Sequence, residues 1–237
     1  MAMTPPLTGI SSMATRAVLA ELAAAWADCG AGAITIESVG GVDAARRVAG
    51  GEAFDVVMLA SDAIDKLIAA GHALPHRVDL VRSPVAVAVP AGAPRPDVGS
   101  EGALRAAVLA APSVGCSTGP SGTFLMTLFQ RWGIADIVAG KLVQPPPGVP
   151  VGTLVASGEV ALGFQQLSEL MALPGIQLLG TLPPGAEFIT TFSGAVCSTC
   201  TRPDAARAWL QYAAAPEPAP ATAAVATIKQ RHGMTPA

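Results

Sequence analysis

The stretch FDVVMLASD, residues 54–62, decides the fold class of this chain. Its first six residues form a nearly continuous apolar run, as expected for a parallel strand that is covered on both faces. Ser61 and Asp62 follow, and residues of these types commonly cap the first turn of a helix. The apolar spacing of residues 63–70 predicts that helix. A strand, a short polar turn and a helix in direct succession are typical of α/β proteins.

The same succession recurs along the whole chain. We expect further strands at residues 7–10, 34–38, 84–90, 114–117, 160–164 and 189–200, and helices at about 42–48, 124–132 and 203–214. Gly133 directly after one of these helices is typical of a helix end. The alternation predicts an α/β fold with mostly parallel sheets flanked by helices.

Composition and charge exclude several kinds of partner. The formal net charge is -3 and only 13% of the residues are charged, which argues against a nucleic-acid partner. The longest helical apolar stretch, residues 17–26, contains Glu21 and is too short for membrane insertion. The opening, Met1 to Thr4, lacks the basic and apolar regions of a secretory signal, which favours cytoplasmic residence. A periplasmic protein whose signal has been removed is the alternative.

The cysteines and histidines do not suggest a metal site or a redox site. Cys197 and Cys200 have the spacing of a redox motif, but they lie in an apolar extended run without the helix start that such a motif uses. Buried thiols are the simpler interpretation. His72, His76 and His232 show no metal-ligand spacing. We therefore expect no metal and no cofactor.

Small residues that donate hydrogen bonds follow four of the predicted strands. These turns are Ser11–Ser12, Gly40–Gly41, Ser61–Asp62 and Ser121–Gly122–Thr123. Ligands of open α/β sheets lie beyond the carboxyl ends of the strands, where helix amino termini present free N–H groups to anions. Helix capping alone explains any one of these turns; the four together favour a site for a small anion. No lysine follows the glycines at 119–122, so the turn is not a nucleotide-binding P-loop.

In this order, the turns resemble those of the molybdate-binding branch of type II periplasmic solute-binding proteins. The resemblance is carried by residues 9–12, 40–48, 54–62, 120–122, 156–166 and 231–234. It implies a two-lobed, periplasmic-binding-protein-like fold with crossing segments near residues 81–86 and 190–195. Lobe one would comprise residues 1–83 plus 192–237, lobe two residues 84–191, and the anion would lie in the cleft between them.

The resemblance also implies a set of ligand-binding residues. Carried over position by position, it gives Ser12, Gly41, Ser121, Val149 and Gln166, beside which Ser11, Gly40, Ser83, Gly122 and Thr123 supply further donors. Gly41 stands where molybdate binders commonly have serine, and Gln166 where they commonly have tyrosine, so two hydroxyls are missing. Arg82 lies by the first crossing, and a guanidinium suits a planar carboxylate. A di- or tricarboxylate ligand is therefore favoured; the alternative for Arg82 is a surface position or an ion pair with Asp62.

Three functions remain open at this point. The first is a solute-binding protein, with an ABC transporter as partner only if the chain is exported. The second is a cytoplasmic isomerase, because aconitate isomerases resemble this family; they move a proton across an allylic system and need a base. Asp62, Glu37 and Cys116 lie near strand ends and are the candidate bases. The third is a molybdate- or tungstate-binding protein of an ABC transporter.

Overall fold

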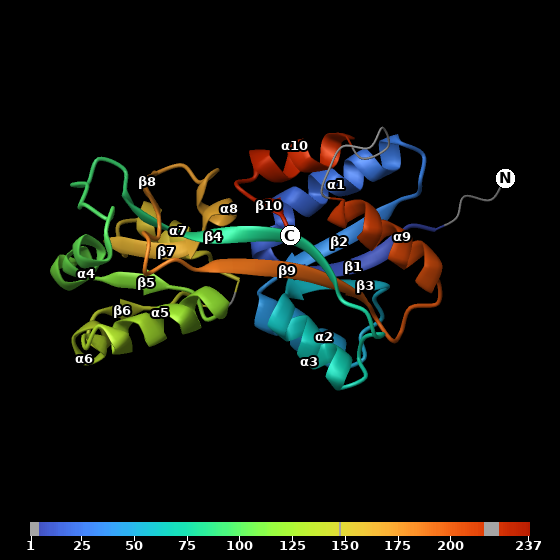
Figure 1. Ribbon diagram of the computed structural model, residues 1–237, viewed down its shortest axis with the longest axis horizontal. Helices are drawn as coiled ribbons and strands as arrows, with labels where there is room; N and C mark the ends of the chain where they lie inside the picture. Colours follow the sequence, from blue (N-terminus) through green and yellow to red (C-terminus); the bar gives the residue numbers. More distant parts are fainter. Residues whose placement is uncertain (1–4, 147, 216–222) are drawn as a thin grey trace. The chain divides into compact units, whose positions relative to one another are not determined.

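The computed structural model describes residues 5–146, 148–215 and 223–237. Three stretches lie outside the described residues: Met1 to Thr4, Pro147, and residues 216–222 of the expected lobe one. The α/β fold is confirmed, with mixed strands flanked by helices (Figure 1). The chain divides into two compact units: unit one is residues 1–82 with 191–237, and unit two is residues 83–190. The expected lobe boundaries lie one residue further along the chain.

Three neighbouring strands of unit one are parallel and end at the same edge. They are β2 (Ile34–Val39), β1 (Leu7–Ser12) and β3 (Val56–Ala60), in that order across the sheet. Antiparallel to β3 runs β9 (Ile189–Val196), and β10 (Thr235–Pro236) pairs with β4 (Val78–Pro90). The register places Ser12 beside Val39 and Ser11 beside both Ser38 and Met58. The carboxyl ends of β1, β2 and β3 therefore meet at one edge.

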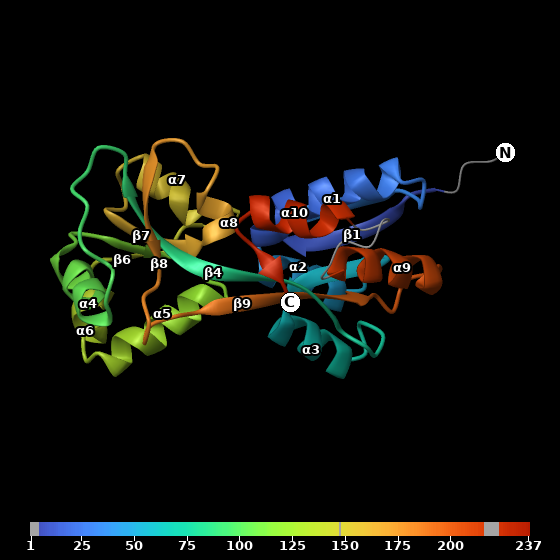
Figure 2. The same ribbon diagram turned by 45° about the horizontal axis from the view of Figure 1, so that its top comes forward.

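Helices cover both faces of this sheet. They are α1 (Arg16–Asp28), α2 (Gly41–Ala49), α3 (Ser61–Ala69), α9 (Pro203–Ala214) and α10 (Ala223–Arg231), with the short 3-10 turn η1 (Met13–Thr15) before α1. Figures 1 and 2 show α1 and α10 on one side of the unit-one strands and α2 and α3 on the other. In β3, Val56 and Met58 pack in the core with α1, α9 and α10, whereas Val57 and Leu59 pack in the core with α2 and α3. Because both faces are covered, the strand is apolar at nearly every position, as its sequence predicted.

Two local expectations for unit one need correction. Ser61 does not cap α3: it is the first helical residue, and Ala60 occupies the N-cap without a side-chain cap. The reason is that β3 runs directly into the helix with no turn between them. The extended run expected to reach residue 200 stops as strand β9 at Val196, and the backbone N–H of Cys200 bonds to the carbonyl of Cys197 at 3.0 Å, closing a turn.

Unit two repeats the arrangement with its own sheet. Its parallel strands are β5 (Val114–Cys116), β6 (Leu142–Val143) and β7 (Leu162–Gln166), and β4 runs antiparallel to β7 and to β8 (Ile176–Thr181). One face packs against α4 (Glu101–Ala110), α5 (Pro120–Arg131) and α6 (Ala135–Ala139), the other against α7 (Val151–Ala156) and α8 (Leu167–Leu170). Helix α5 begins at Pro120, four residues earlier than expected, because proline suits the first helical position. Gly133 has a φ of 66° after α5, as expected for a helix-ending glycine.

Lys229 of α10 is fully buried inside unit one. Its Nζ donates hydrogen bonds to the carbonyls of Ala214 and Ala215 at 3.1 and 3.2 Å, beside the carboxyl end of α9. Burial penalises the charged ammonium and lowers the pKa of Lys229 to about 8. Folding therefore disfavours the protonated form of this side chain.

This burial predicts a pH-dependent contribution to stability. Between the folded pKa of about 8 and the ordinary value of 10.5, the unfolded chain holds more protons at this site, so stability rises with pH. Urea unfolding of wild type and Lys229→Met at pH 8 and pH 10 should show the stability difference shift by about 2 kcal/mol in favour of wild type. The comparison cancels the titration of cysteines and tyrosine, which the two proteins share. A difference that stays constant with pH contradicts the assignment.

Candidate functional site

The first donor cluster lies at the carboxyl ends of β1 and β2 and consists of Ser11, Ser12, Ser38, Gly40 and Gly41. The hydroxyls of Ser11 and Ser38 lie 2.8 Å apart, as the strand register requires. The side chain of Ser12 is directed at α2, since a Cβ added to Gly41 would lie 3.7 Å from the Ser12 Cβ. Ser12 is only 7% exposed, yet its Oγ has no hydrogen-bond partner among the described residues.

The amino terminus of α2 completes this cluster. Gly40 occupies its N-cap and offers no side chain, so the first-turn N–H groups of this nine-residue helix are not capped by one. Free N–H groups and the helix dipole both favour an anion at such an end. A buried hydroxyl without a partner normally marks a missing water, ion or ligand. The hydroxyl of Ser12 and the uncapped α2 amino terminus therefore offer neighbouring donors that can bind a small anion.

The second donor cluster lies where β5 leads into α5 and consists of Ser117, Gly119, Ser121, Gly122 and Thr123. The Ser117 and Ser121 hydroxyls lie 3.0 Å apart, and the Gly119 N–H donates to the Ser117 Oγ at 3.3 Å. A Cβ on Gly122 would lie 1.7 Å from the Ser117 carbonyl oxygen, so only glycine allows this close approach. The Thr123 hydroxyl is exposed and donates to the Gly119 carbonyl at 3.4 Å. The turn is thus held tightly in front of the α5 amino terminus.

Two more buried polar groups lie on the α5 side of the unit-two sheet. Gln166 pairs with Val85, and Ser83, two residues before Val85, shares that face. The Gln166 Nε2 donates to the Thr190 Oγ1 at 2.6 Å. The Gln166 Oε1 and the Ser83 Oγ are buried, and neither has a partner within the described ranges. Unit two therefore contains unsatisfied polar atoms at the end of β7, as unit one does at the end of β1.

The other two expected ligand residues, Val149 and Arg82, belong to neither donor cluster. The N–H of Val149 donates to the Pro146 carbonyl at 3.1 Å, so it is already engaged in a turn. Arg82 is exposed on β4, opposite Thr235 of β10. The alternative ion pair between Arg82 and Asp62 is not formed within the described residues, where Asp62 lies 3.8 Å from the Lys66 Nζ.

The structure gives the three candidate bases different environments. Both oxygens of Glu37 accept hydrogen bonds from Arg47, which lower the pKa of that exposed carboxyl. Burial raises the pKa of the Cys116 thiol, and that of Cys197 to about 12, so neither thiol is activated. Asp62 is exposed at the start of α3. Neither Glu37 nor Cys116 has the environment of a base that works near neutral pH.

Sequence reasoning missed Glu169, a half-buried carboxyl on α8. Burial raises the pKa of Glu169 to about 7, although a hydrogen bond from Gln165 opposes the shift. The signal available in the sequence was the spacing of four residues between Gln165 and Glu169 directly after a strand. That spacing is common in helices. The pKa of Glu169 is raised by burial, and burial depends on the tertiary fold.

Within residues 5–146, 148–215 and 223–237 no group of three or more histidine, cysteine or acidic side chains could hold a metal ion. In the same ranges no helix is long and apolar enough to cross a membrane.

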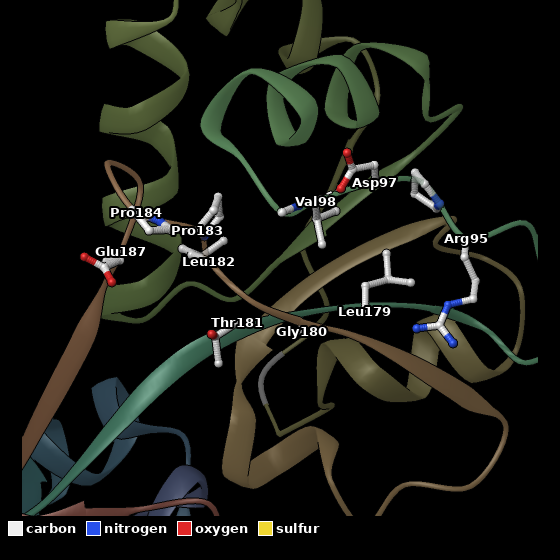
Figure 3. A pocket seen from close by; sticks show the side chains of 12 residues that line it. Arg95, Asp97, Val98, Leu179, Gly180, Thr181, Leu182, Pro183, Pro184 and Glu187 are labelled. Atoms are coloured by element: carbon white, nitrogen blue, oxygen red, sulfur yellow. Dashed lines mark hydrogen bonds between the residues drawn. The ribbon is translucent and has the colours of Figure 1, made fainter.

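A hollow of about 550 Å³ opens beside β8 in unit two (Figure 3). Figure 3 shows Arg95 at one end and Glu187 at the other, with Leu179, Leu182 and Val98 between them. None of the residues of either donor cluster lines this hollow. We therefore assign the candidate site to the donor clusters and not to this depression.

The class of protein is established by comparison with known families. The sequence profile of the bacterial extracellular solute-binding proteins matches residues 7–234, and the chain belongs to that family. It is 44% identical over 178 residues to a curated aconitate isomerase from a Pseudomonas species, covering 74% of this chain and 68% of the relative.

Two solved structures with the same fold are named for the binding of small inorganic anions. The periplasmic molybdate-binding protein of Azotobacter vinelandii superposes with a TM-score of 0.77 at 18% identity, covering 97% of this chain and 98% of that one. The sulfate-binding protein SubI of Mycobacterium tuberculosis gives a TM-score of 0.77 at 16% identity, covering 98% and 87%. At these identities the likeness concerns the fold alone.

Proposed function

We propose that this protein binds a small unsaturated tricarboxylate and isomerises it by an allylic proton shift, as an aconitate isomerase does. The observation that carries the proposal is the 44% identity to the curated aconitate isomerase over 178 residues. The two donor clusters support it, because each offers hydroxyls and N–H groups suited to one carboxylate.

The unsatisfied groups favour a carboxylate over a tetrahedral oxyanion. Gly41 contributes no hydroxyl next to Ser12, and Gln166 offers a planar amide. If the Thr190 hydroxyl donates to the Gln166 oxygen, both amide N–H groups become free to donate to a ligand. A planar pair of donors matches a planar carboxylate.

The second candidate function is transport-linked binding of molybdate or a similar oxyanion. The fold shared with molybdate- and sulfate-binding proteins favours it. A solute-binding protein in this role would deliver its ligand to a transporter and would leave it chemically unchanged.

A ligand screen separates the two functions. Thermal unfolding is followed with trans-aconitate, citrate, molybdate, tungstate and sulfate, and trans-aconitate is then incubated with the protein while its ultraviolet absorbance is recorded. A ligand present at about 100 times its Kd stabilises the folded state by roughly 2.7 kcal/mol. We expect stabilisation by trans-aconitate and a slow absorbance change. Stabilisation by molybdate alone, with unchanged absorbance, contradicts the proposal.

Replacing Ser12 with alanine should weaken trans-aconitate binding without weakening the fold. A hydrogen bond to a charged ligand contributes about 1.5–3 kcal/mol, so we expect an affinity loss of at least tenfold. Folding stability should hold, because the Ser12 hydroxyl has no partner in the described protein. Ser100→Ala is the matched control: its Oγ caps α4 by accepting from the Ala103 N–H at 3.2 Å, so it should lower stability and leave affinity unchanged. Calorimetric titration and urea unfolding of both variants test the contrast; equal affinity of Ser12→Ala and wild type refutes it.

A further inference from the structure

Glu169 is joined to the strand-end edge of unit two by a short chain of hydrogen bonds. The Gln165 Nε2 donates to the Glu169 Oε1 at 2.8 Å, and the Gln165 Oε1 accepts from the Gly152 N–H at 2.9 Å. Gln165 is only 3% exposed, and both its Nε2 and its Oε1 are fixed by these hydrogen bonds. Since α8 begins directly after β7, the Glu169 carboxyl is held at the edge where the parallel strands β5 and β7 end.

The carboxyl of Glu169 has no compensating charge from the described part of the chain. None of the described lysine, arginine or histidine side chains forms an ion pair with it, and its Oε2 has no hydrogen-bond partner there. The elements packed against α8 are β7 and β8, and neither carries a titratable side chain; α7, which shares the same core, carries none either. Burial without a cation raises the pKa of Glu169 to about 7.

Other described carboxyls have the opposite environment. Glu37 and Glu52 accept hydrogen bonds from Arg47, and Glu101 accepts from Trp132 and Arg131; in all three the pKa is lowered. A half-buried carboxyl that retains a free oxygen is costly to maintain for packing alone, and such groups concentrate at functional sites. A proton acceptor also works best when its pKa lies near the working pH.

We propose that Glu169 is the base that moves the proton in the isomerisation, with Gln165 holding its carboxyl in place. This inference rests on the proposed function and names the residue that performs its chemistry. The free Oε2 accepts a proton from the methylene carbon beside a ligand carboxylate, and the C–H bond breaks. Its electron pair forms a new C=C bond while the original double bond shifts, and Glu169 returns the proton to the far allylic carbon. Atoms and electrons balance without any oxidant, reductant or second substrate.

The test compares Glu169→Gln with wild type and with Glu159→Gln, an exposed carboxyl of the same unit. Glutamine keeps the shape and the acceptor for Gln165 but cannot take up a proton. We expect kcat for trans-aconitate to fall at least a hundredfold, within the range for a lost general base, while Kd by calorimetry changes less than threefold. Exchange of the ligand methylene protons in D₂O should disappear in Glu169→Gln and persist in Glu159→Gln.

The possible results distinguish failure of the proposed function from failure of the role assigned to Glu169. If wild type binds trans-aconitate without isomerising it, the proposed function is wrong and the role of Glu169 falls with it. If wild type is active and Glu169→Gln retains its rate or its D₂O exchange, only the assignment of Glu169 is wrong. A variant that loses rate and affinity in parallel assigns Glu169 to ligand binding and overturns its role as the base.

The pH profile of the wild-type protein tests the proposal without a variant. The value of kcat/KM should rise through about pH 7, and a flat profile from about pH 5.5 to 8.5 overturns the proposal.

Discussion

Replacing Gly122 with alanine should destabilise unit two by roughly 3 kcal/mol, the upper end of the usual range for an overpacked position. The added Cβ would lie 1.7 Å from the carbonyl oxygen of Ser117 and 2.8 Å from its carbonyl carbon. Both atoms belong to the backbone, so no side-chain rotation relieves the clash. Either the turn before α5 moves, which separates the Ser117 and Ser121 hydroxyls, or the helix shifts in its core.

Urea unfolding together with hydrogen exchange resolved by peptide tests this expectation. The loss of protection should begin in peptides covering β5 and α5. Gly102→Ala is the matched control, because it is also a helical glycine of unit two and nothing lies within 4 Å of its added Cβ. That variant should be as stable as wild type or more stable by about 0.5–1 kcal/mol, since alanine favours helix. Equal stability of the two variants contradicts the close-approach interpretation.

The fold could be predicted because its signals are local and repeated. The apolar run of residues 54–59 reads as a strand covered on both faces, and α2, α3 and α9 follow their strands within a residue or two of expectation. Element ends were less predictable: Ser61 has the chemistry of a cap, yet it became the first helical residue because β3 enters α3 without a turn. Boundaries of this kind depend on how the strand meets its helix in three dimensions, which residue type alone does not determine.

The strand-end turns could likewise be predicted as donor clusters, but the state of individual groups could not. The sequence does not distinguish Ser11, whose hydroxyl is bonded to Ser38, from Ser12, whose hydroxyl has no partner in the described chain. Glu169 was missed since its pKa depends on burial by elements distant in sequence. The ligand, its turnover and the expected cytoplasmic residence stay predictions.

The cysteine pair illustrates how a motif can be structural. The Cys200 thiol donates a hydrogen bond to the Asp55 Oδ1 at 3.2 Å. The other oxygen of Asp55 accepts from the Thr8 N–H at 2.8 Å and lies 3.4 Å from the Arg202 Nη2. Arg202 in turn donates to the carbonyls of Pro5 and Pro6. One buried carboxylate thereby ties β1, β3 and the turn after β9 together.

Replacing Asp55 with asparagine should consequently destabilise unit one by about 3 kcal/mol at pH 7, because an amide group then faces the buried donors that the carboxylate satisfied. Burial alone would raise the pKa of Asp55, but the hydrogen bonds from Thr8 and Cys200 and the charge of Arg202 outweigh it and hold the pKa below 3.8. A lowered pKa contributes stability above the ordinary value and loses it as pH falls through the folded value. The difference in free energy of unfolding between wild type and Asp55→Asn should therefore be full at pH 7 and shrink below about pH 4.

The control is Asp204→Asn, at an exposed ion pair with Arg207 in the same unit, which should be as stable as wild type at every pH. A gap that persists undiminished at pH 3 would show that shape, and not charge, makes Asp55 necessary.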